Sequence, residues 1–366
     1  MSLLSEISEK RKEIKTDGYL MSLGEWISLY GADEIDIHPE FQRFFRWSDQ
    51  QKTNLIESIL LGIPIPPIFV SQRADGVWDV VDGLQRLSTI YHFLGILKDE
   101  DKSVLPPLAL LGTKYLPSLK GIMWQHPTKK SHSLPDEARL LIKRSKIAAS
   151  IILRESDDTA KYDLFQRLNT GGSQLSPQEV RNCILVMLNR KMFLWLKKLA
   201  DYEPFRTCVA LSDRPIEEAY DLELVLRFIL LAFIDVDKLK KVGDIGVFLT
   251  DRMRDIALDD TFKRGEYETI FKKTFDLLEK RVGSNAFKRY NTTKQRHEGG
   301  FLVSQFEVVA FGIAFNLKTS IKSEQIASKI KSIWSNTGYT VWTRSGITAT
   351  RRLPHLVPLG RKLFGK

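Results

Sequence analysis

The pattern of apolar positions predicts an N-terminal region that mixes helices and strands. Residues 1–34 show helical spacing, and residues 35–38 alternate like a short strand. Residues 68–71 and 77–81 are short apolar runs with a Gly-containing turn signal between them, which predicts a β-hairpin. The presence of helical and strand-like patterns in one region favours an α+β fold.

Four signals predict where helices begin and end. Ser48-Asp49-Gln50-Gln51 and Ser176-Pro177-Gln178-Glu179 both have the form of a capping box, in which Ser and the residue three positions later cap the helix N-terminus. Gly83 interrupts the second strand of the hairpin, and apolar residues at helical spacing follow it. Gly95 should end that helix.

The rest of the chain changes character near residue 180. Residues 98–136 have the composition of an irregular insertion, and they precede a helix, a strand and a further helix. We therefore expect a first domain over residues 1–180 and a mainly helical second domain over residues 181–366. After the insertion, the first domain should contain a helix over residues 135–143, a strand over 147–153 and a helix over 157–168. In the second domain, the clearest helical patterns cover residues 222–233, 266–280, 306–315 and 324–333.

Length and composition agree with two ordinary globular domains. The chain has 366 residues, of which 43% are hydrophobic and 27% charged. No apolar run approaches the ~20 residues that a membrane span needs, and the charged first 15 residues lack the apolar core of a secretory signal. The two cysteines, Cys183 and Cys208, form no disulfide or zinc pattern. We expect a cytoplasmic protein without a membrane partner.

The charge of the chain favours an anionic partner. The net charge is +10 and the sequence pI is about 9.4, which suits nucleic acid, although mild basicity without any specific partner explains the charge equally well. Residues 343–366 carry six basic residues and no acidic one. This segment and residues 281–296 interleave cations with aromatic rings, as DNA-contacting surfaces do, and the alternative is a solvated helical face with a loose tail. The candidate DNA-binding residues are Lys288, Arg289, Arg344, Arg351 and Arg352.

The segment Asp82-Gly83-Leu84-Gln85-Arg86 joins the second hairpin strand to a helix. The first turn of a helix exposes unpaired N–H groups and a partial positive charge, so a cation there costs about 0.3–1 kcal/mol. An anion bound between the N–H groups and Arg86 would reverse that sign. Asp82 can orient Arg86, cap the turn or hold a divalent ion. The alternative is a simple turn that Asp82 caps, with Arg86 along the surface.

Several separated motifs in the first half of the chain resemble one known family. They are Phe41-Gln42-Arg43-Phe44-Phe45-Arg46-Trp47, Leu55-Ile56-Glu57-Ser58-Ile59-Leu60, Ile63-Pro64-Ile65-Pro66-Pro67, Val81-Asp82-Gly83-Leu84-Gln85-Arg86-Leu87 and Phe165-Gln166-Arg167-Leu168-Asn169-Thr170-Gly171-Gly172. In this order they resemble the GmrSD-type domain, a ParB-like family of bacterial anti-phage restriction proteins. The family signature reads Asp-Gly-Gln-Gln-Arg, and Leu84 replaces the first Gln here.

The resemblance implies a fold, a ligand and an activity. It implies a ParB/sulfiredoxin-like N-terminal domain that binds and hydrolyses a nucleoside triphosphate with Mg²⁺, coupled to recognition or cutting of foreign or modified DNA. Arg86 would stabilise transition-state charge and Asp82 would position water or the metal, so these two are the candidate catalytic residues. The resemblance and the local sequence give as candidate phosphate-binding residues Gln42, Arg43, Gly83, Gln85, Arg86, Asn169, Thr170, Gly171, Gly172 and Arg181. The alternative for Arg43 is an ion pair that fixes the loop before Trp47, and the alternative for residues 169–172 is a helix C-cap followed by a turn.

The sequence contains neither an HNH nuclease motif nor a Walker-type nucleotide-binding loop, each of which would indicate a different activity. Relatives of this type often carry an HNH nuclease, but neither His297 nor His355 lies in the Asp-His or His-His pair that this chemistry needs. No Walker-type loop is present. The leading hypothesis is a nucleotide-hydrolysing subunit of a restriction-like defence system that works with DNA, and with a separate nuclease subunit or further copies of itself. The alternatives are a non-catalytic DNA-binding regulator and a nuclease that cuts through the ParB-like domain.

The sequence also makes a prediction about Arg86 itself. Its side chain is expected to point away from the apolar stripe of its helix, so that Arg86→Ala should abolish hydrolysis and leave the fold intact.

Overall fold

The structure, a computed structural model, describes residues 2–7, 15–37, 47–99, 101–154, 156, 176–317 and 321–365. The chain forms two compact units, Met1–Gln174 and Leu175–Lys366. The division lies just before helix α7 (Pro177–Ala200), whereas the boundary predicted from the sequence, after residue 180, lies inside that helix. The α+β fold class is confirmed, since a sheet lies in the first unit and most of the second is helical.

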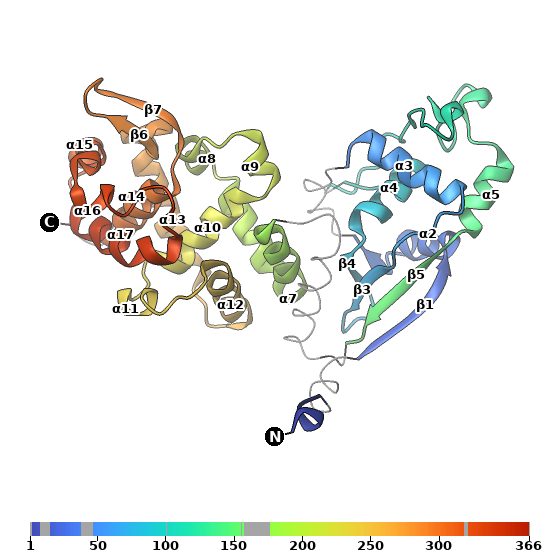
Figure 1. The fold of residues 1–366 in the computed structure, drawn as a ribbon, viewed down its shortest axis with the longest axis horizontal. Helices are drawn as coiled ribbons and strands as arrows, with labels where there is room; N and C mark the ends of the chain where they lie inside the picture. Colours follow the sequence, from blue (N-terminus) through green and yellow to red (C-terminus); the bar gives the residue numbers. More distant parts are fainter. Residues whose placement is uncertain are drawn as a thin grey trace. The chain divides into compact units, whose positions relative to one another are not determined.

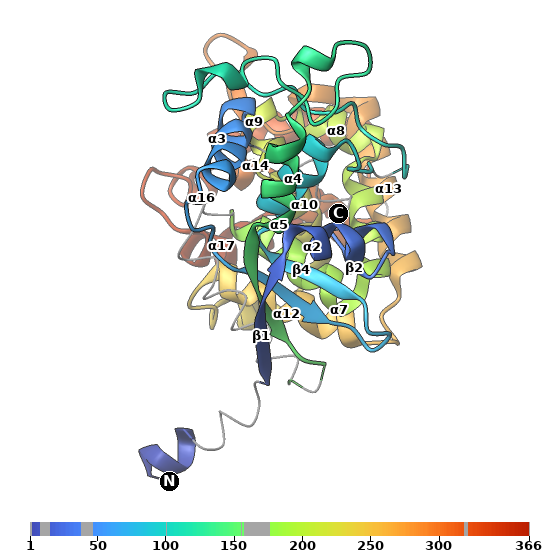
Figure 2. The ribbon, with the colours of Figure 1, turned by 90° about the vertical axis from the view of Figure 1, so that its right-hand side faces the viewer.

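The first unit is built on one five-stranded mixed sheet (Figures 1 and 2). The strand order is β1-β5-β3-β4-β2, with β3 in the centre, antiparallel to β4 and parallel to β5. The predicted hairpin is therefore present. The strands are β1 (Thr16–Ser22), β2 (Ile35–Asp36), β3 (Ile68–Gln72), β4 (Trp78–Asp82) and β5 (Lys146–Ile152).

Four helices in the described part of the first unit pack with the sheet, and both predicted features of their ends are confirmed. Ser48 and Gln51 form the capping box of α3, and Gly95 ends α4 in the left-handed conformation. In Figure 1, α3, α4 and α5 gather above the sheet. Their apolar faces and that of α2 form the core, where the Tyr91 hydroxyl donates to the Trp26 carbonyl at 3.0 Å. The helices are α2 (Leu23–Gly31), α3 (Asp49–Leu60), α4 (Leu84–Leu94) and α5 (Asp136–Arg144).

The predicted insertion contains only two single-turn 3-10 helices, Pro117–Leu119 and Lys130–His132, in its described part. It is nevertheless fixed to α3. The Thr53 hydroxyl oxygen accepts a hydrogen bond from the Leu111 N–H at 3.0 Å, and the buried Glu57 carboxylate accepts one from the Leu116 N–H at 3.2 Å. Buried polar side chains on α3 thus hold an irregular segment in a defined position.

The expectation that residues 1–34 are helical is wrong over Thr16–Ser22. These residues form β1, which pairs antiparallel with β5 along its whole length. Only the last positions of β1 are shielded from solvent, so its sequence lacks the alternation that identifies a strand. Helix α2 then begins at a Ser22–Glu25 capping box.

The second unit is a cluster of helices with one small hairpin. The helices are α7, α8 (Glu203–Val209), α9 (Asp213–Glu217), α10 (Tyr220–Leu231), α11 (Val236–Leu239), α12 (Ile245–Leu258), α13 (Arg264–Arg281), α14 (Val303–Asn316), α15 (Ile326–Ser332), α16 (Thr337–Thr340) and α17 (Ala349–Phe364). The capping box at Ser176 is confirmed, and α7 kinks at Asn189. The hairpin, β6 (Lys288–Asn291) and β7 (Arg296–Phe301), was missed, because neither strand contains a buried residue.

Helices α14 and α17 pack against each other at two glycines. A Cβ on Gly312 would lie 2.5 Å from the Gly360 carbonyl oxygen, and one on Gly360 would lie 2.2 Å from the Val308 carbonyl oxygen. Any side chain larger than that of glycine at either position would push the backbones of α14 and α17 apart. The loose tail considered for residues 343–366 is therefore largely a packed helix, with Leu356 and Phe364 buried.

No helix within the described residues is long and apolar enough to span a bilayer.

Candidate functional site

The segment Asp82–Arg86 forms the predicted strand–turn–helix. Strand β4 ends at Asp82, Gly83 turns the chain, and α4 begins at Leu84. Gly83 has φ +97°, which L side chains rarely adopt, and a Cβ there would lie 2.3 Å from Ile68 Cδ1. Both the backbone conformation and the packing therefore require glycine at this position.

The Arg86 guanidinium is folded back onto the turn and the chain before β3. Its Nη2 donates to Asp82 Oδ2 at 2.6 Å, and its Nη1 donates to the carbonyl oxygens of Pro66 and Pro67 at 2.5 and 2.9 Å. The Arg86 side chain is 12% exposed and that of Asp82 is 35% exposed. The turn is thus linked to a segment about twenty residues earlier in the chain.

This geometry corrects two expectations about the turn. Asp82 orients Arg86, but it does not cap α4, because Gly83 is the N-cap residue and no side chain caps it. Arg86 does not simply extend along the surface either, since its charge is neutralised and its donors join three separate acceptors. Sequence reasoning missed the two proline carbonyls, and the Pro66-Pro67 pair was their only signal.

The N-terminus of α4 has neither a capping side chain nor an acidic residue in its first turn. Helices α2 and α3 have complete capping boxes, and α5, which also lacks a capping side chain, has Asp136 and Glu137 in its first turn. The positive end of a helix dipole therefore lies beside a partly exposed carboxylate and an ordered guanidinium. Gln85 lies half-buried in this same turn.

These groups could hold a phosphate together with a metal ion, although they supply only one carboxylate for the metal. A helix N-terminus and an arginine suit phosphate oxygens, and Mg²⁺ is commonly held by one or two carboxylates together with phosphates and water. Asp82 supplies one such carboxylate. No group of three or more His, Cys, Asp or Glu side chains that could hold a metal by itself occurs among the residues that the structure describes.

A family comparison identifies the region around this turn. Residues 25–186 match the family model described as the GmrSD restriction endonuclease, N-terminal domain. These residues form a GmrSD-type N-terminal domain. The match confirms the resemblance seen in the motifs, and it associates the chain with restriction-like defence proteins that act on DNA. It ends in α7, just before the kink at Asn189. No curated protein and no solved structure gave a significant match.

Several candidate phosphate-binding residues of the GmrSD-type domain lie outside the described residues. These are Gln42 and Arg43 before α3, and the run Asn169, Thr170, Gly171 and Gly172 before α7. The helix expected over residues 157–168 lies outside them as well. Of the candidates that lie within the described residues, those of the Asp82–Arg86 segment are close together.

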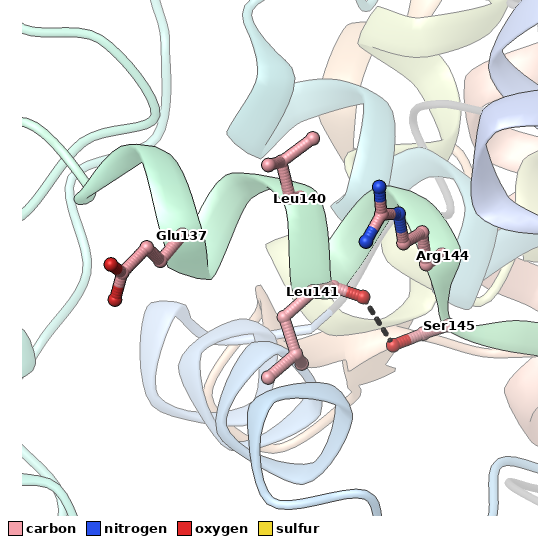
Figure 3. Close-up of a pocket in the computed structure, with 5 residues that line it drawn as sticks. All are labelled: Glu137, Leu140, Leu141, Arg144 and Ser145. Carbon is pink, nitrogen blue, oxygen red and sulfur yellow. Dashed lines mark hydrogen bonds between the residues drawn. The ribbon is translucent and has the colours of Figure 1, made fainter.

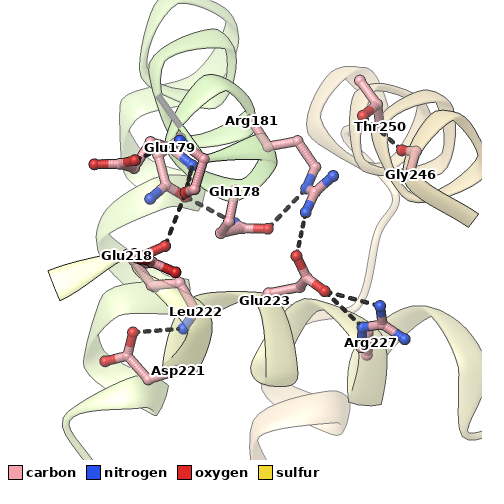
Figure 4. A network of polar contacts seen from close by, with 12 residues as sticks. Gln178, Glu179, Arg181, Glu218, Asp221, Leu222, Glu223, Arg227, Gly246 and Thr250 are labelled. Carbon is pink, nitrogen blue, oxygen red and sulfur yellow. Dashed lines mark hydrogen bonds and ion pairs between the residues drawn. The ribbon is translucent and has the colours of Figure 1, made fainter. Parts of the chain in front are cut away.

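Arg181 occupies an interior position on α7, in the second unit (Figure 4). Its guanidinium donates to Glu223 Oε2 at 2.6 Å and to Gln178 Oε1 at 2.7 Å, and its side chain is 3% exposed. Removing one partner from a buried ion pair is costly, so this arrangement indicates a structural role. We do not retain Arg181 among the phosphate-binding candidates.

The ion pairs of Arg181 continue through the second unit to Arg352. Glu223 also accepts from Arg227, and Arg227 pairs with the fully buried Glu307 at 3.3 Å. Arg352 then clasps Glu307 with two hydrogen bonds, of 2.7 and 2.9 Å. Burial alone would lower the pKa of Arg227, but Glu223 and Glu307 together raise it.

This placement also corrects one DNA-binding prediction. Because both donors of the Arg352 fork are used in the interior, Arg352 joins α17 to α14 and is not a free surface cation. Arg344 and Arg351 are exposed beside the start of α17. Lys288 and Arg289 lie on β6, with Arg289 exposed. Four of the five candidate DNA-binding residues therefore remain at least partly accessible.

The described surface of the first unit also has a shallow depression on α5, of about 500 Å³ (Figure 3). Glu137, Leu140, Leu141, Arg144 and Ser145 line it, and the Ser145 hydroxyl donates to the Leu141 carbonyl at 2.9 Å. None of the predicted site residues belongs to it. It is open and has no buried polar group directed into it, so it adds nothing to the turn described above.

Proposed function

We propose that the GmrSD-type domain binds the phosphates of a nucleoside triphosphate with Mg²⁺ at the Asp82–Arg86 turn and hydrolyses this nucleotide as part of a restriction-like defence function. The observation that carries the proposal is the combination of an uncapped helix N-terminus with an ordered arginine and a partly exposed carboxylate. The helix N-terminus, the arginine and the carboxylate would each interact with a bound nucleotide in a different way. The ParB-like classification of the fold is part of this proposal.

In the proposed complex, the chain's own groups divide the work. The first-turn N–H groups of α4 would donate to phosphate oxygens, and the guanidinium of Arg86 would neutralise charge that develops during transfer. Asp82 would hold the metal or position the attacking water. The ion pair with Asp82 and the proline carbonyls already fix the direction of the guanidinium, which reduces the entropy lost on binding.

One observation favours a second candidate, a non-catalytic DNA-binding regulator with the same domain. Arg86 has three acceptors within the chain and needs no ligand to balance its charge. In that case the signature segment would be a structural clasp between the β4–α4 turn and the chain before β3. We propose the nucleotide-binding function first, because α4, unlike α2, α3 and α5, has neither a capping side chain nor a first-turn carboxylate, and its first N–H groups are therefore suited to a phosphate.

Calorimetric titration of the full chain with ATP, GTP, CTP and UTP, each with Mg²⁺, tests the proposal. Binding of at least one of them is expected, with thermal stabilisation of about 2.7 kcal/mol at a ligand concentration 100 times Kd. Arg86→Lys should weaken binding, because lysine keeps the charge but not the forked donors. Arg144→Ala, which removes an exposed arginine of the same unit, should not. No heat and no stabilisation with all four nucleotides would refute the proposal and favour the regulator.

A further inference from the structure

The hairpin β6–β7 reaches the core of its unit only at its base, where the ring of Phe301 packs against those of Phe287 and Phe306. Neither strand has a buried residue, although Phe287, immediately before β6, is buried. The Leu302 N–H donates to the Phe287 carbonyl at 2.9 Å, so the base of the hairpin is fixed. In Figure 1 the hairpin extends beyond the neighbouring helices. Beyond this base, the side chains of the two strands are at most partly buried, so most of them are accessible to another molecule.

The hairpin is strongly basic and its outer cations are ordered. Residues 288–301 contain four Lys or Arg residues and one carboxylate, Glu298. Glu298 pairs with Arg296 at 3.1 Å and with Lys294 at 3.5 Å, and it accepts from the Asn291 amide at 3.0 Å. The shared carboxylate holds both cations near the turn without neutralising both. The hairpin therefore keeps a net positive charge.

Aromatic rings order two further cations beside the strands. The Arg289 guanidinium lies 5.8 Å from the ring centre of Trp334, and Lys331 Nζ lies 5.3 Å from that of Tyr290. Trp334 is itself fixed, because its Nε1 donates to Gln305 at 3.1 Å. Such contacts restrict long side chains at exposed positions, so less entropy is lost when a phosphate binds to them.

The backbone of β7 is exposed near the base of the hairpin, where two glycines follow each other. Between the register pairs Lys288–Phe301 and Arg289–Glu298, β7 contains the additional residues Gly299 and Gly300. Both glycines are exposed, and a Cβ at either one would meet no atom within 4 Å. Gly299 has φ +75°, so the bulge itself favours glycine at that position. Neither packing nor a positive φ requires glycine at position 300, and the exposed backbone there leaves room for a close approach by another molecule.

From these features we infer that the β6–β7 hairpin enters the major groove of double-stranded DNA and contacts its phosphates and base edges. The inference rests on the proposed action on DNA, and it names the element and the form of nucleic acid. A two-stranded ribbon fits the major groove of B-form DNA, which is about 12 Å wide. It does not fit the deep and narrow major groove of A-form RNA. Ordered cations along both strands match the charge of the flanking phosphates.

Binding of the full chain to a labelled 20-base-pair DNA duplex, measured by fluorescence anisotropy over a range of salt, tests the inference. Lys294→Ala/Arg296→Ala should weaken binding up to about 60-fold at 0.1 M salt and reduce the salt slope by about 1.8, as expected for two lost phosphate contacts. The control Lys263→Ala/Arg264→Ala removes two exposed cations at the start of α13 and should change affinity less than about threefold. Equal effects of the two variants would overturn the inference.

Two further measurements identify the groove and separate this inference from the proposed nucleotide site. Methylation of guanine N7, which lies in the major groove, should interfere with binding, whereas methylation of adenine N3 in the minor groove should not. Duplex RNA should compete poorly. The reverse pattern, or no binding of the wild-type chain to duplex DNA, would refute the inference. Calorimetry of the hairpin variant with nucleotides reports separately on the Asp82–Arg86 turn, and it should match the wild type.

Discussion

Arg86→Ala should destabilise the GmrSD-type domain, contrary to the expectation from sequence alone. The substitution removes one charge-assisted hydrogen bond, to Asp82, and two to the carbonyls of Pro66 and Pro67. A hydrogen bond to a charged group contributes about 1.5–3 kcal/mol. The Asp82 side chain is 35% exposed, so water and salt screen its share. The prolines are exposed as well, and their carbonyls can regain water.

These contributions add to a loss of about 2 kcal/mol in the free energy of unfolding. For a unit of this size, that loss corresponds to a fall of about 4–8 °C in Tm. Differential scanning calorimetry of the ligand-free full chain measures it. Arg144→Ala is the matched control, because it removes an exposed arginine from the last turn of α5 and should cost only a few tenths of a kcal/mol, about 1 °C.

A double-mutant cycle with Asp82→Ala separates the ion pair from the carbonyl contacts. A coupling energy of about 1 kcal/mol between the two positions is expected for a partly exposed pair in direct contact. An unchanged or raised Tm in Arg86→Ala would refute this reasoning. It would mean that the guanidinium does not hold the turn to the proline segment in solution, and that the helix-dipole penalty dominates.

Two further predictions concern the second unit. Gly360→Ala should cost at least about 2 kcal/mol and lower Tm by several degrees, because its Cβ would meet the Val308 carbonyl oxygen at 2.2 Å, whereas Gly265→Ala in α13, where a Cβ has open space, should stabilise by about 0.4–1 kcal/mol. Equal Tm values for the two variants would contradict the close packing of α14 and α17. Burial raises the pKa of Tyr220 to about 12, so its contribution to stability is complete below pH 10 and is lost as pH rises to 12. Tm measured against pH should therefore fall less steeply in Tyr220→Phe than in the wild type over that interval, and parallel curves would refute the assignment.

Features decided by neighbouring residues could be read from the sequence. The capping boxes at Ser48 and Ser176 and the left-handed glycines Gly83 and Gly95 each depend on groups within a few positions of one another. Their hydrogen bonds form whenever the local backbone does, whatever lies around them. The same locality makes the Asp82–Arg86 ion pair predictable, since the two side chains are four positions apart.

Features that depend on distant partners could not be read in this way. Residues 16–22 form a strand because they pair with β5, more than a hundred residues later in the chain. The sequence of β1 does not alternate between apolar and polar residues, so it gives little sign of this pairing. Likewise α17, considered as a loose basic tail, is a helix that fills a surface of α14. Pairing and packing of this kind override weak local preferences.

The roles of the arginines show the same division most clearly. Sequence alone placed Arg86, Arg181 and Arg352 among anion-binding residues, because each is a cation in a suggestive context. The fold gives Arg86 two backbone acceptors from a segment about twenty residues away, and it gives Arg181 and Arg352 glutamates more than forty residues away. The sequence determined where the positive charges are. Only the tertiary structure decided which of them are neutralised inside the protein, because a side chain's partner is set by proximity in space.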